Sequence, residues 1–423
     1  MNGPATVALL LAMDRFEDFY DTLGISLEDF RDRVSGVWPF NYVDALHSAG
    51  IRTVLFFASA RVSEPLRFRH RASGATVCVV PSPRLHQKLQ GARDRFLPGS
   101  RVMRSLLSYA SIPPRLLARE LRRERCQAIL CQEYEHARFD VCVLLGRLLR
   151  LPVFATFQGA TGGASRLERP IRPLALRSCA GLIIGAGSEL ARVQARYALP
   201  TAKLAHIPNP IDANGQPPLA RRLGRERLGI DPDTRVVVWH GRVQIELKGL
   251  DVLLESWPLV CDARPDLPLL LLVGGGNDAE QLRRLLRASG LDNVRWVDRF
   301  VVDRDELWQY LAAADVSALP SRREGFAVAA LEAMACGLPL VAAEVNGITE
   351  ILEGGEESGG IVVPSGDAAA LARGLRRVLD DEQLRRELGA RARRRVQEQF
   401  SLEAVGGQLR QFMTGTRAFH AIR

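Results

Sequence analysis

Two glutamates, Glu324 and Glu332, lie eight residues apart in the stretch EGFAVAALEAMACG. On one continuous helix this spacing would separate the carboxylates by roughly 12 Å, a little over two turns, and direct them to nearly the same side. Carboxylates at that separation are badly placed to share a proton. They are well placed to hold two distant parts of one long ligand that carries hydroxyl groups.

The residues around these glutamates predict a strand, a turn and a helix. An apolar strand over 316–319 is followed by an Ala-rich helix that continues to Cys336, where a glycine and a proline stop it. The start of a helix offers unpaired backbone N–H groups and the positive end of the helix dipole, which favour an anionic ligand such as a diphosphate. The amides of Gly325 and Phe326 are the expected contacts.

The same stretch resembles a known family. The E-x7-E spacing inside EGFAVAALEAMACGLPLVAAEVNGITEIL, with PS-x-x-EGF before it, is similar to the signature of the retaining GT-B glycosyltransferases of family 4. The resemblance covers most of residues 200–400, where several motifs follow in the family's order, and is looser over the first 150. It implies a hexosyltransferase that uses a nucleotide-diphosphate sugar, UDP- or GDP-linked, and retains the anomeric configuration. Glu324 would then bind sugar hydroxyls and Glu332 the ribose hydroxyls.

Two further motifs resemble the donor site of that family. Gly241-Arg242 and Lys248-Gly249 match a G-R-x(n)-K-G pattern, whose Arg and Lys clamp the donor diphosphate in the family. The physical reason is that two cations neutralise the charges of a pyrophosphate and stabilise it as a leaving group. Farther along, Arg299, Phe300 and Val301 stand where family members hold the base.

Alternating strand-like and helical runs predict an α/β fold with doubly wound parallel sheets. Together with the resemblance they predict GT-B architecture, two Rossmann-like domains facing across a cleft. The expected domains are an acceptor-side domain over 1–210, a nucleotide-sugar domain over 211–400, and a C-terminal helix over 401–423 that crosses back to the first. The Pro-rich segment after Pro208 supports the boundary.

The acceptor side is less well defined. Gln158 follows a predicted strand where many family members carry a histidine, and an amide can bond a sugar hydroxyl but cannot act as acid or base. Glu133 is the nearest titratable alternative. Gly36 is the candidate for the family's glycine-rich turn, after an insertion in which we expect acceptor recognition. Trp38 and Phe40 could be stacking platforms there, although core packing is the likelier role for a single aromatic residue.

Composition indicates an ordinary globular protein with an uneven charge distribution. Residues 1–200 contain 28 Lys and Arg against 17 Asp and Glu, whereas residues 201–423 contain 29 against 31. The basic half, above all Arg84–Arg125, could lie on an anionic membrane surface, but glycines and a proline interrupt that segment, so an ordinary charged helix pair is the stronger interpretation. Nothing resembles a nucleic-acid motif. Seven scattered cysteines and the lack of a signal-like N-terminus favour the cytoplasm, with peripheral contact at the inner face of the membrane.

No cofactor or metal is expected besides the donor substrate. No Asp-x-Asp pair lies near the donor motifs, so the cationic work falls to Arg242 and Lys248. The expected partners are a nucleotide sugar and a glycan, lipid or small-molecule acceptor. Two alternatives stay open: a catalytically inactive GT-B partner or regulatory protein, and a sugar-nucleotide epimerase.

Overall fold

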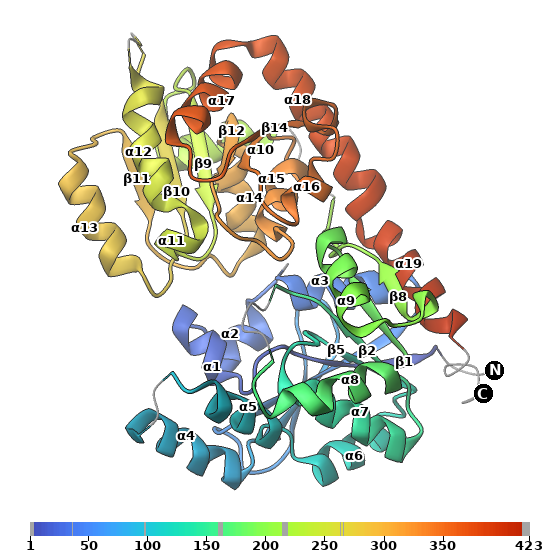
Figure 1. The fold of residues 1–423 in the computed structure, drawn as a ribbon. Helices are drawn as coiled ribbons and strands as arrows, with labels where there is room; N and C mark the ends of the chain where they lie inside the picture. Colours follow the sequence, from blue (N-terminus) through green and yellow to red (C-terminus); the bar gives the residue numbers. More distant parts are fainter. Residues whose placement is uncertain are drawn as a thin grey trace. The chain divides into compact units, whose positions relative to one another are not determined.

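The chain folds as two compact α/β units. The computed structural model describes residues 4–35, 37–96, 99–159, 164–213, 219–262, 264 and 266–416. Unit 1 comprises Met1–Arg33, Pro39–Pro208 and Val405–Arg423, and unit 2 comprises Val34–Trp38 and Asn209–Ala404 (Figure 1). The change from unit 1 to unit 2 falls within two residues of the predicted boundary, and the change back falls near residue 404.

Unit 1 contains a sheet in the order β3-β4-β2-β1-β5-β6-β7-β8. All neighbouring strands are parallel except β3 and β4, which pair antiparallel. β3 was not predicted from the sequence. It has only four residues, alternates Leu66 and Phe68 with two arginines, and has no fully buried residue. The strands are β1 (Thr6–Leu10), β2 (Arg52–Ser59), β3 (Leu66–Arg69), β4 (Thr76–Pro81), β5 (Ala128–Cys131), β6 (Val153–Thr156), β7 (Gly181–Ile184) and β8 (Leu204–His206).

Helices connect these strands as expected for parallel crossovers. The basic segment after residue 84 forms three helices, α4 to α6, and not the expected pair. The helices are α1 (Glu17–Tyr20), α2 (Leu27–Asp32), α3 (Trp38–Ser48), α4 (Arg84–Phe96), α5 (Arg101–Ala110), α6 (Pro114–Arg123), α7 (Ala137–Leu149), α8 (Glu168–Ser178) and α9 (Gly187–Tyr197), with 3-10 turns η1 (Asp21–Leu23) and η2 (Thr201–Lys203).

Aromatic side chains fix the insertion after β1 to the core of unit 1. Phe16 and Phe30 are fully buried and pack edge to face, with ring centroids 5.5 Å apart. Phe40 is 1% exposed and stacks on His70 at 3.7 Å. The interpretation of Phe40 as a binding platform is therefore wrong, because both faces of its ring lie in the core. Trp38 is half-buried at the start of α3.

The C-terminal helix α19 (Leu402–Gly415) packs against unit 1 from Val405 onward. Gly406 allows this contact, since a Cβ there would lie 2.1 Å from the carbonyl oxygen of Ala45 on α3. Farther along, the ring of Phe412 lies 5.9 Å from that of Phe154 on β6. The helix thus contacts both a helix and a strand of unit 1.

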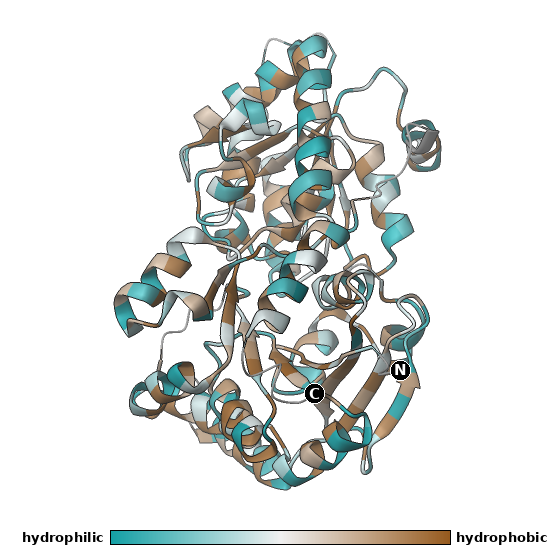
Figure 2. Ribbon diagram, turned by 90° about the vertical axis from the view of Figure 1, so that its right-hand side faces the viewer, coloured by the Kyte–Doolittle hydropathy of each residue, from teal (hydrophilic) through white to brown (hydrophobic). Residues whose placement is uncertain are grey.

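Unit 2 contains a fully parallel sheet in the order β11-β10-β9-β12-β13-β14. Residues alternate between its two faces, so Val236 and Val238 on β9 join one buried cluster and Val237 and Trp239 join the other. Helices cover both clusters, and Figure 2 shows brown, hydrophobic residues along the strands and teal on outer helix surfaces. The strands are β9 (Val236–His240), β10 (Leu269–Val273), β11 (Val294–Val297), β12 (Val316–Leu319), β13 (Leu340–Ala343) and β14 (Gly360–Val363).

The helices of unit 2 follow the same alternation with the strands. They are α10 (Leu219–Leu228), α11 (Ile245–Lys248), α12 (Leu250–Cys261), α13 (Ala279–Ser289), α14 (Arg304–Ala312), α15 (Val328–Ala335), α16 (Ile348–Ile351), α17 (Ala368–Asp380) and α18 (Glu382–Arg395), with the short turns η3 (Gly355–Ser358) and η4 (Val396–Phe400). The two parallel α/β units confirm the predicted fold class.

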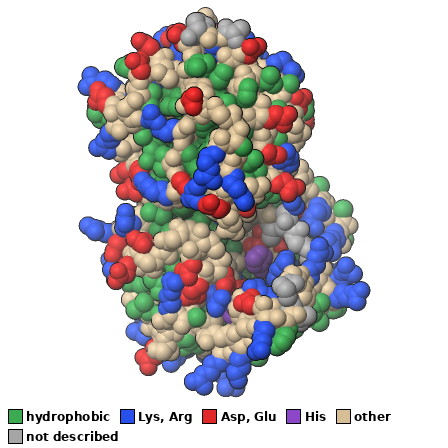
Figure 3. Space-filling model, turned by 90° about the vertical axis from the view of Figure 1, so that its left-hand side faces the viewer, with side chains coloured by type: hydrophobic (Ala, Val, Ile, Leu, Met, Phe, Trp, Pro, Cys, Tyr) green, Lys and Arg blue, Asp and Glu red, His purple; other side chains and the backbone are tan. Residues whose placement is uncertain are grey.

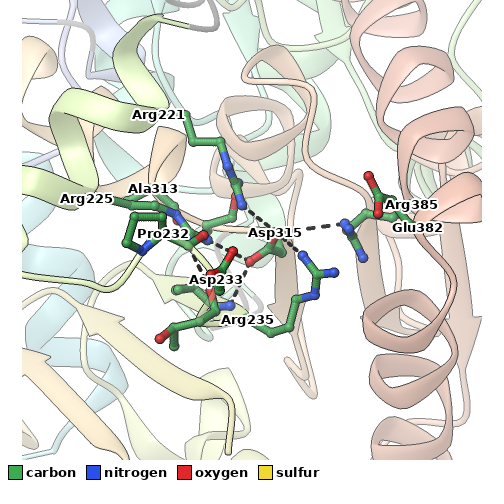
Figure 4. A network of polar contacts seen from close by, with 12 residues as sticks. Arg221, Arg225, Pro232, Asp233, Arg235, Ala313, Asp315, Glu382 and Arg385 are labelled. Atoms are coloured by element: carbon green, nitrogen blue, oxygen red, sulfur yellow. Dashed lines mark hydrogen bonds and ion pairs between the residues drawn. The ribbon is translucent and has the colours of Figure 1, made fainter. Parts of the chain in front are cut away.

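A buried carboxylate, Asp315, fixes the start of β12. Its side chain is 2% exposed and accepts the backbone N–H of Val236 at 2.8 Å. Four arginines from α10, α18 and the start of β9 surround it, with nitrogen–oxygen distances of 2.7, 2.9, 3.9 and 3.7 Å (Figure 4): Arg221, Arg225, Arg235 and Arg385. Because β12 leads into the loop that carries Glu324, this network positions one side of the candidate site.

Candidate functional site

The donor motifs of unit 2 lie at one edge of its sheet. Gly241 and Arg242 follow β9, Gly274 follows β10, and Pro320 follows β12. These strands are parallel, so their carboxyl ends share an edge, which is where open α/β sheets bind ligands. The fold therefore gathers motifs that are about 80 residues apart in the sequence.

Lys248 and Glu324 form an ion pair at this edge. The ammonium nitrogen of Lys248 lies 2.8 Å and 2.9 Å from the two carboxylate oxygens of Glu324. The Ser321 hydroxyl donates to the same carboxylate at 2.6 Å. The Glu324 side chain is only 8% exposed and that of Lys248 22%, so water screens the pair less than it would on an open surface.

Close backbone contact makes this pairing possible. Gly249, which follows Lys248, adopts a left-handed conformation with φ 64°, and a Cβ there would lie 2.0 Å from the carbonyl oxygen of Pro320. Arg322 holds the same two segments together, because its guanidinium bonds both carboxylate oxygens of Asp251 at 2.7 and 2.6 Å. Only glycine allows the loop after α11 to approach the end of β12 this closely.

Glu332 lies on α15 and is bonded to a histidine at the end of β9. The Nε2 atom of His240 is 3.1 Å from a carboxylate oxygen of Glu332, and the two side chains are 5% and 14% exposed. His240 directly precedes Gly241-Arg242, so one strand end supplies both a support for Glu332 and a cation.

The prediction that the two glutamates share one helix is wrong. Helix α15 begins at Val328, and Glu324 lies in the loop before it. Phe326 explains the difference, because its side chain is 7% exposed and packs into the core, 6.0 Å from the ring of Phe400. Burying this ring holds the chain away from the helical path. Among the described residues, the N–H groups of Gly325 and Phe326 have no hydrogen-bond partner.

Arg242 lies beside the glycine run that follows β10. A Cβ at Gly276 would lie 3.0 Å from Cγ of Arg242, and one at Gly274 would lie 1.8 Å from the carbonyl oxygen of Gly241. The run therefore allows close backbone packing between two strand ends. Arg242 is half-buried, and burial lowers the pKa of its guanidinium from its ordinary value.

The predicted base-binding residues lie at the same edge, after β11. Arg299 is paired with Glu306 on α14, and this hydrogen bond raises the pKa of the guanidinium. Val301 packs partly buried against the core, and Phe300 is half-buried. The N–H of Ser35 donates to the Val302 carbonyl at 3.1 Å, so the segment around residue 35 joins unit 2 here. Gly36 lies outside the described residues.

Gln158 belongs to a polar network at the strand ends of unit 1. Its side-chain amide donates to Gln132 at 3.1 Å and to Thr156 at 2.9 Å, and its backbone N–H donates to the Glu133 carboxylate at 3.0 Å. Glu133 is 3% exposed and has φ 85°, an uncommon value for a residue with a side chain. A buried carboxylate on a strained backbone is typical of functional strand ends.

Sequence reasoning missed two residues that support the site. His240 bonds Glu332 and Ser321 bonds Glu324. Ser321 stands three residues before Glu324, a spacing at which a hydroxyl and a carboxylate commonly meet in a turn, so its role could have been inferred. His240 could not, because the contact joins residues 92 positions apart.

The described residues show neither a metal cluster nor a membrane span. They contain no group of three His, Cys, Asp or Glu side chains arranged to hold a metal ion. None of their helices combines the length and apolar character needed to span a bilayer.

Comparison with known proteins places this arrangement in a class. The solved structure of sucrose-phosphate synthase from Thermosynechococcus elongatus superposes with a TM-score of 0.70 at 21% identity, covering 97% of this chain and 98% of that one. Two parallel α/β units with such neighbours define the GT-B fold. Residues 221–395 match the family model described as glycosyl transferases group 1. The matched segment lies within unit 2.

Curated relatives match only part of the chain. The D-inositol 3-phosphate glycosyltransferase of Jonesia denitrificans is 35% identical over 52% of this chain and 53% of its own length. A GDP-mannose-dependent monoacylated alpha-(1-6)-phosphatidylinositol monomannoside mannosyltransferase of Corynebacterium glutamicum is 33% identical over 48% of this chain and 54% of its own. The chain thus spans about half the length of the curated relatives it matches.

Proposed function

We propose that the chain is a retaining, metal-independent hexosyltransferase that uses a UDP- or GDP-sugar and a glycan, lipid or small-molecule acceptor. The observation that carries this proposal is the Lys248–Glu324 ion pair, at 2.8 Å, beside the open amides of Gly325 and Phe326. A cation and unpaired backbone N–H groups bind phosphate, and a carboxylate accepts hydrogen bonds from sugar hydroxyls. The four groups come from two motifs that the fold brings together.

Lys248 and Arg242 would carry the negative charge of the diphosphate. An ammonium has three N–H donors, and Glu324 takes at most two of them, so one is left for a phosphate oxygen. Arg242, from the neighbouring strand end, would add a planar guanidinium that suits phosphate geometry. As the bond to the sugar breaks, both cations stabilise the leaving phosphate, which is the role that a metal ion takes in other transferases.

Glu332 would bind the ribose, with its orientation set by His240. One carboxylate oxygen bonds His240, and a carboxylate can accept from the two hydroxyls of a vicinal diol. Arg299, Phe300 and Val301 would lie against the base. Arg299 is engaged by Glu306, so backbone atoms and the half-buried Phe300 are the better candidates for base contact. The GDP-mannose dependence in one relative's name agrees with a purine donor.

The acceptor would bind to unit 1 near Gln158. Gln158 cannot accept a proton, and Glu133 is engaged by two backbone N–H groups, those of Gln158 and Glu135. The leaving phosphate would therefore help to deprotonate the acceptor hydroxyl, in a front-face reaction that retains the anomeric configuration. Relatives named for inositol 3-phosphate and a phosphatidylinositol mannoside suggest an acceptor with several hydroxyl groups.

The experiment is a transferase assay with purified protein, a panel of UDP- and GDP-sugars, and chelator. We expect activity to survive chelator and to fall about 10²–10³-fold in Lys248→Ala, the usual loss when one electrostatic contact to the transition state is removed. Glu332→Ala should lose activity chiefly through a higher KM for donor. Arg373→Ala, an exposed cation on α17, and Glu353→Ala, an exposed acid, are the matched controls in unit 2.

Activity unchanged in Lys248→Ala and Glu332→Ala would refute the site. An inactive GT-B partner protein would bind donor without hydrolysing or transferring it, and a sugar-nucleotide epimerase would change the donor without acceptor. Analysis of products formed without acceptor separates these alternatives. The anomeric configuration of the product, read by NMR, tests retention.

Unit 1 would also contact an anionic membrane through α4 and α5. These helices expose apolar side chains, among them Leu85 (61%) and Phe96 (68%), between the arginines and lysine of the segment. On the face of unit 1 drawn in Figure 3, Lys and Arg side chains gather along the right-hand edge. Sedimentation with vesicles that contain phosphatidylglycerol tests this contact, and Arg93→Gln/Arg95→Gln should weaken it.

A further inference from the structure

A second arginine-rich site lies in unit 1, away from the donor motifs. Helices α8 and α9 border a pocket of about 480 Å³. Four arginines and a tyrosine line it, together with an alanine and a proline: Arg169, Arg172, Arg177, Arg196 and Tyr197. No acidic residue is among the lining residues. The volume falls in the range of small-molecule sites, but the lining is far more basic than usual.

Arg172 forms the buried part of the pocket, and its charge is compensated from within. Its side chain is 2% exposed and bonds Asp140 at 2.7 and 3.3 Å. It also bonds Glu168 at 3.1 Å and the carbonyl oxygen of Tyr134 at 2.7 Å. These four contacts fix the guanidinium, so Arg172 gives the pocket a rigid wall and adds little net charge.

The other three arginines are exposed and carry uncompensated charge. Within the described ranges, no carboxylate lies within 4 Å of Arg169, Arg177 or Arg196. The guanidinium of Arg196 lies over the ring of Tyr197, 5.3 Å from its centroid, which limits its orientations. Lys203 adds a further cation at the end of α8, where its ammonium donates to the Cys179 carbonyl at 2.7 Å.

We propose that this pocket binds a phosphate group, carried by a soluble phosphorylated molecule or by a lipid head group. Cations that lack carboxylate partners repel one another, and a bound dianion removes that repulsion. The planar guanidinium fork matches phosphate oxygens in pairs, which a lysine cannot do. Arg169 lies one turn before Arg172 on α8, and Arg196 on α9 lines the same pocket, so exposed cations from two helices border it.

The surroundings of the pocket admit either source of phosphate. Ile171 and Leu174 on α8 are 43% and 64% exposed, so apolar surface adjoins the arginines as it would beside a lipid head group. The pocket volume is also sufficient for a free phosphorylated sugar or polyol. The phosphate chemistry is common to both, and two arms of one experiment distinguish them.

The first arm measures binding of inorganic pyrophosphate to the full chain by calorimetry. The wild type should show two sites, the proposed donor site and the pocket. Arg169→Gln/Arg196→Gln should weaken one of them about a hundredfold, because two charge-assisted bonds are lost and each is worth roughly tenfold. Lys248→Ala should weaken only the other site, and Arg123→Gln, an exposed arginine of α6 outside the pocket, should change neither.

The second arm measures sedimentation with vesicles of phosphatidylcholine that contain phosphatidic acid. Weaker vesicle binding by Arg169→Gln/Arg196→Gln assigns a lipid head group, whereas unchanged vesicle binding with weaker pyrophosphate binding assigns a soluble phosphate. The membrane variant Arg93→Gln/Arg95→Gln separates any contribution of α4. If pyrophosphate and vesicles bind the pocket variant as they bind the wild type, the proposal is overturned. That result leaves the donor site untouched, since the Lys248→Ala response reports on it separately.

Discussion

The two units contain buried ionic networks of opposite composition. In unit 2 one acid, Asp315, is surrounded by four arginines. In unit 1 one arginine, Arg172, is shared by two acids, Asp140 and Glu168. The first network lies at the start of β12 and supports the sheet, whereas the second forms the wall of a pocket. Each is satisfied by further bonds to backbone carbonyl groups.

This difference determines how each unit responds when its central charge is lost. Removing an arginine leaves carboxylates, which can become neutral by taking up protons. Removing an aspartate leaves guanidinium groups, which stay charged at any pH that a protein tolerates. Unit 1 can therefore adapt to a lost ion pair near neutral pH, and unit 2 cannot.

The largest expected effect is that of Asp315→Asn. The variant leaves Arg225, 4% exposed, beside a neutral amide, and losing one partner of a buried pair costs about 3–5 kcal/mol. Chemical denaturation should show this loss in the free energy of unfolding, equal at pH 6 and pH 8. Asp380→Asn, which removes an exposed partner of Arg264, is the control and should cost under about 1 kcal/mol. A similarly small loss for Asp315→Asn would mean that the backbone carbonyl groups bonded to the arginines stabilise their charges without the carboxylate.

Arg172→Met should lower the free energy of unfolding slightly less than Asp315→Asn does, by about 3 kcal/mol at pH 8. Unlike the loss in Asp315→Asn, this loss should depend on pH. Burial already raises the pKa of Asp140 with Arg172 present, and removing the cation raises it further. A folded-state pKa above the unfolded value means that the folded chain binds more protons, so stability rises as the pH falls. Between pH 8 and pH 5.5 the cost should shrink by roughly 1–2 kcal/mol. A cost that does not change with pH would erase the contrast with Asp315.

The sequence predicted which residues of unit 2 would lie together because they occur in short motifs at the ends of strands. Arg242, Lys248 and Gly325 follow β9 and β12, which are parallel, and the match to a known family covers residues 221–395. The sequence predicted the parallel sheets because buried strands are continuous apolar runs. It misplaced Glu324 on a helix, since a local pattern cannot show that burial of Phe326 bends the chain.

The rest of unit 1 could not be predicted from local patterns. The pocket is lined by Arg169 on α8 and Arg196 on α9. In the sequence each of them is indistinguishable from an ordinary solvated arginine. Buried pairs such as Arg172 with Asp140 connect residues 32 positions apart. The bond between Gln158 and Gln132 depends on which strands are neighbours in the sheet. The sequence predicts the class of fold but not the order of its strands. Long-range contacts of this kind have no signal in spacing.

The contrast between the units extends to two histidines. His136 begins α7 in unit 1, where burial and then the charges of Arg138 and Arg172 lower its pKa to about 4. A histidine with a depressed folded-state pKa adds stability above its unfolded value near 6.5, and this stability is lost as the pH falls toward 4. Wild type should therefore lose roughly 2–3 kcal/mol relative to His136→Gln between pH 7 and pH 4. Denaturation curves of both proteins at each pH give this difference, and the contributions of the carboxylates cancel because both proteins contain them. If the unfolding free energies of the two proteins changed with pH in the same way, His136 would be exposed to solvent.

The histidine of unit 2 stands beside an acid, and its expected effect is the smallest. His240→Phe keeps the ring buried but removes the bond at 3.1 Å to Glu332. If that bond only fixes the carboxylate, KM for donor should rise about tenfold, the worth of one hydrogen bond to a charged group, with kcat within about twofold. His240→Gln should recover part of the loss.

Comparing the binding of a nucleoside diphosphate with that of its 2′,3′-dideoxy form makes the test specific. Wild type should discriminate between them and His240→Phe much less, because the unsupported carboxylate no longer meets the diol. An equal loss of affinity for both nucleotides would show that His240 supports the fold of β9 and not the recognition of ribose.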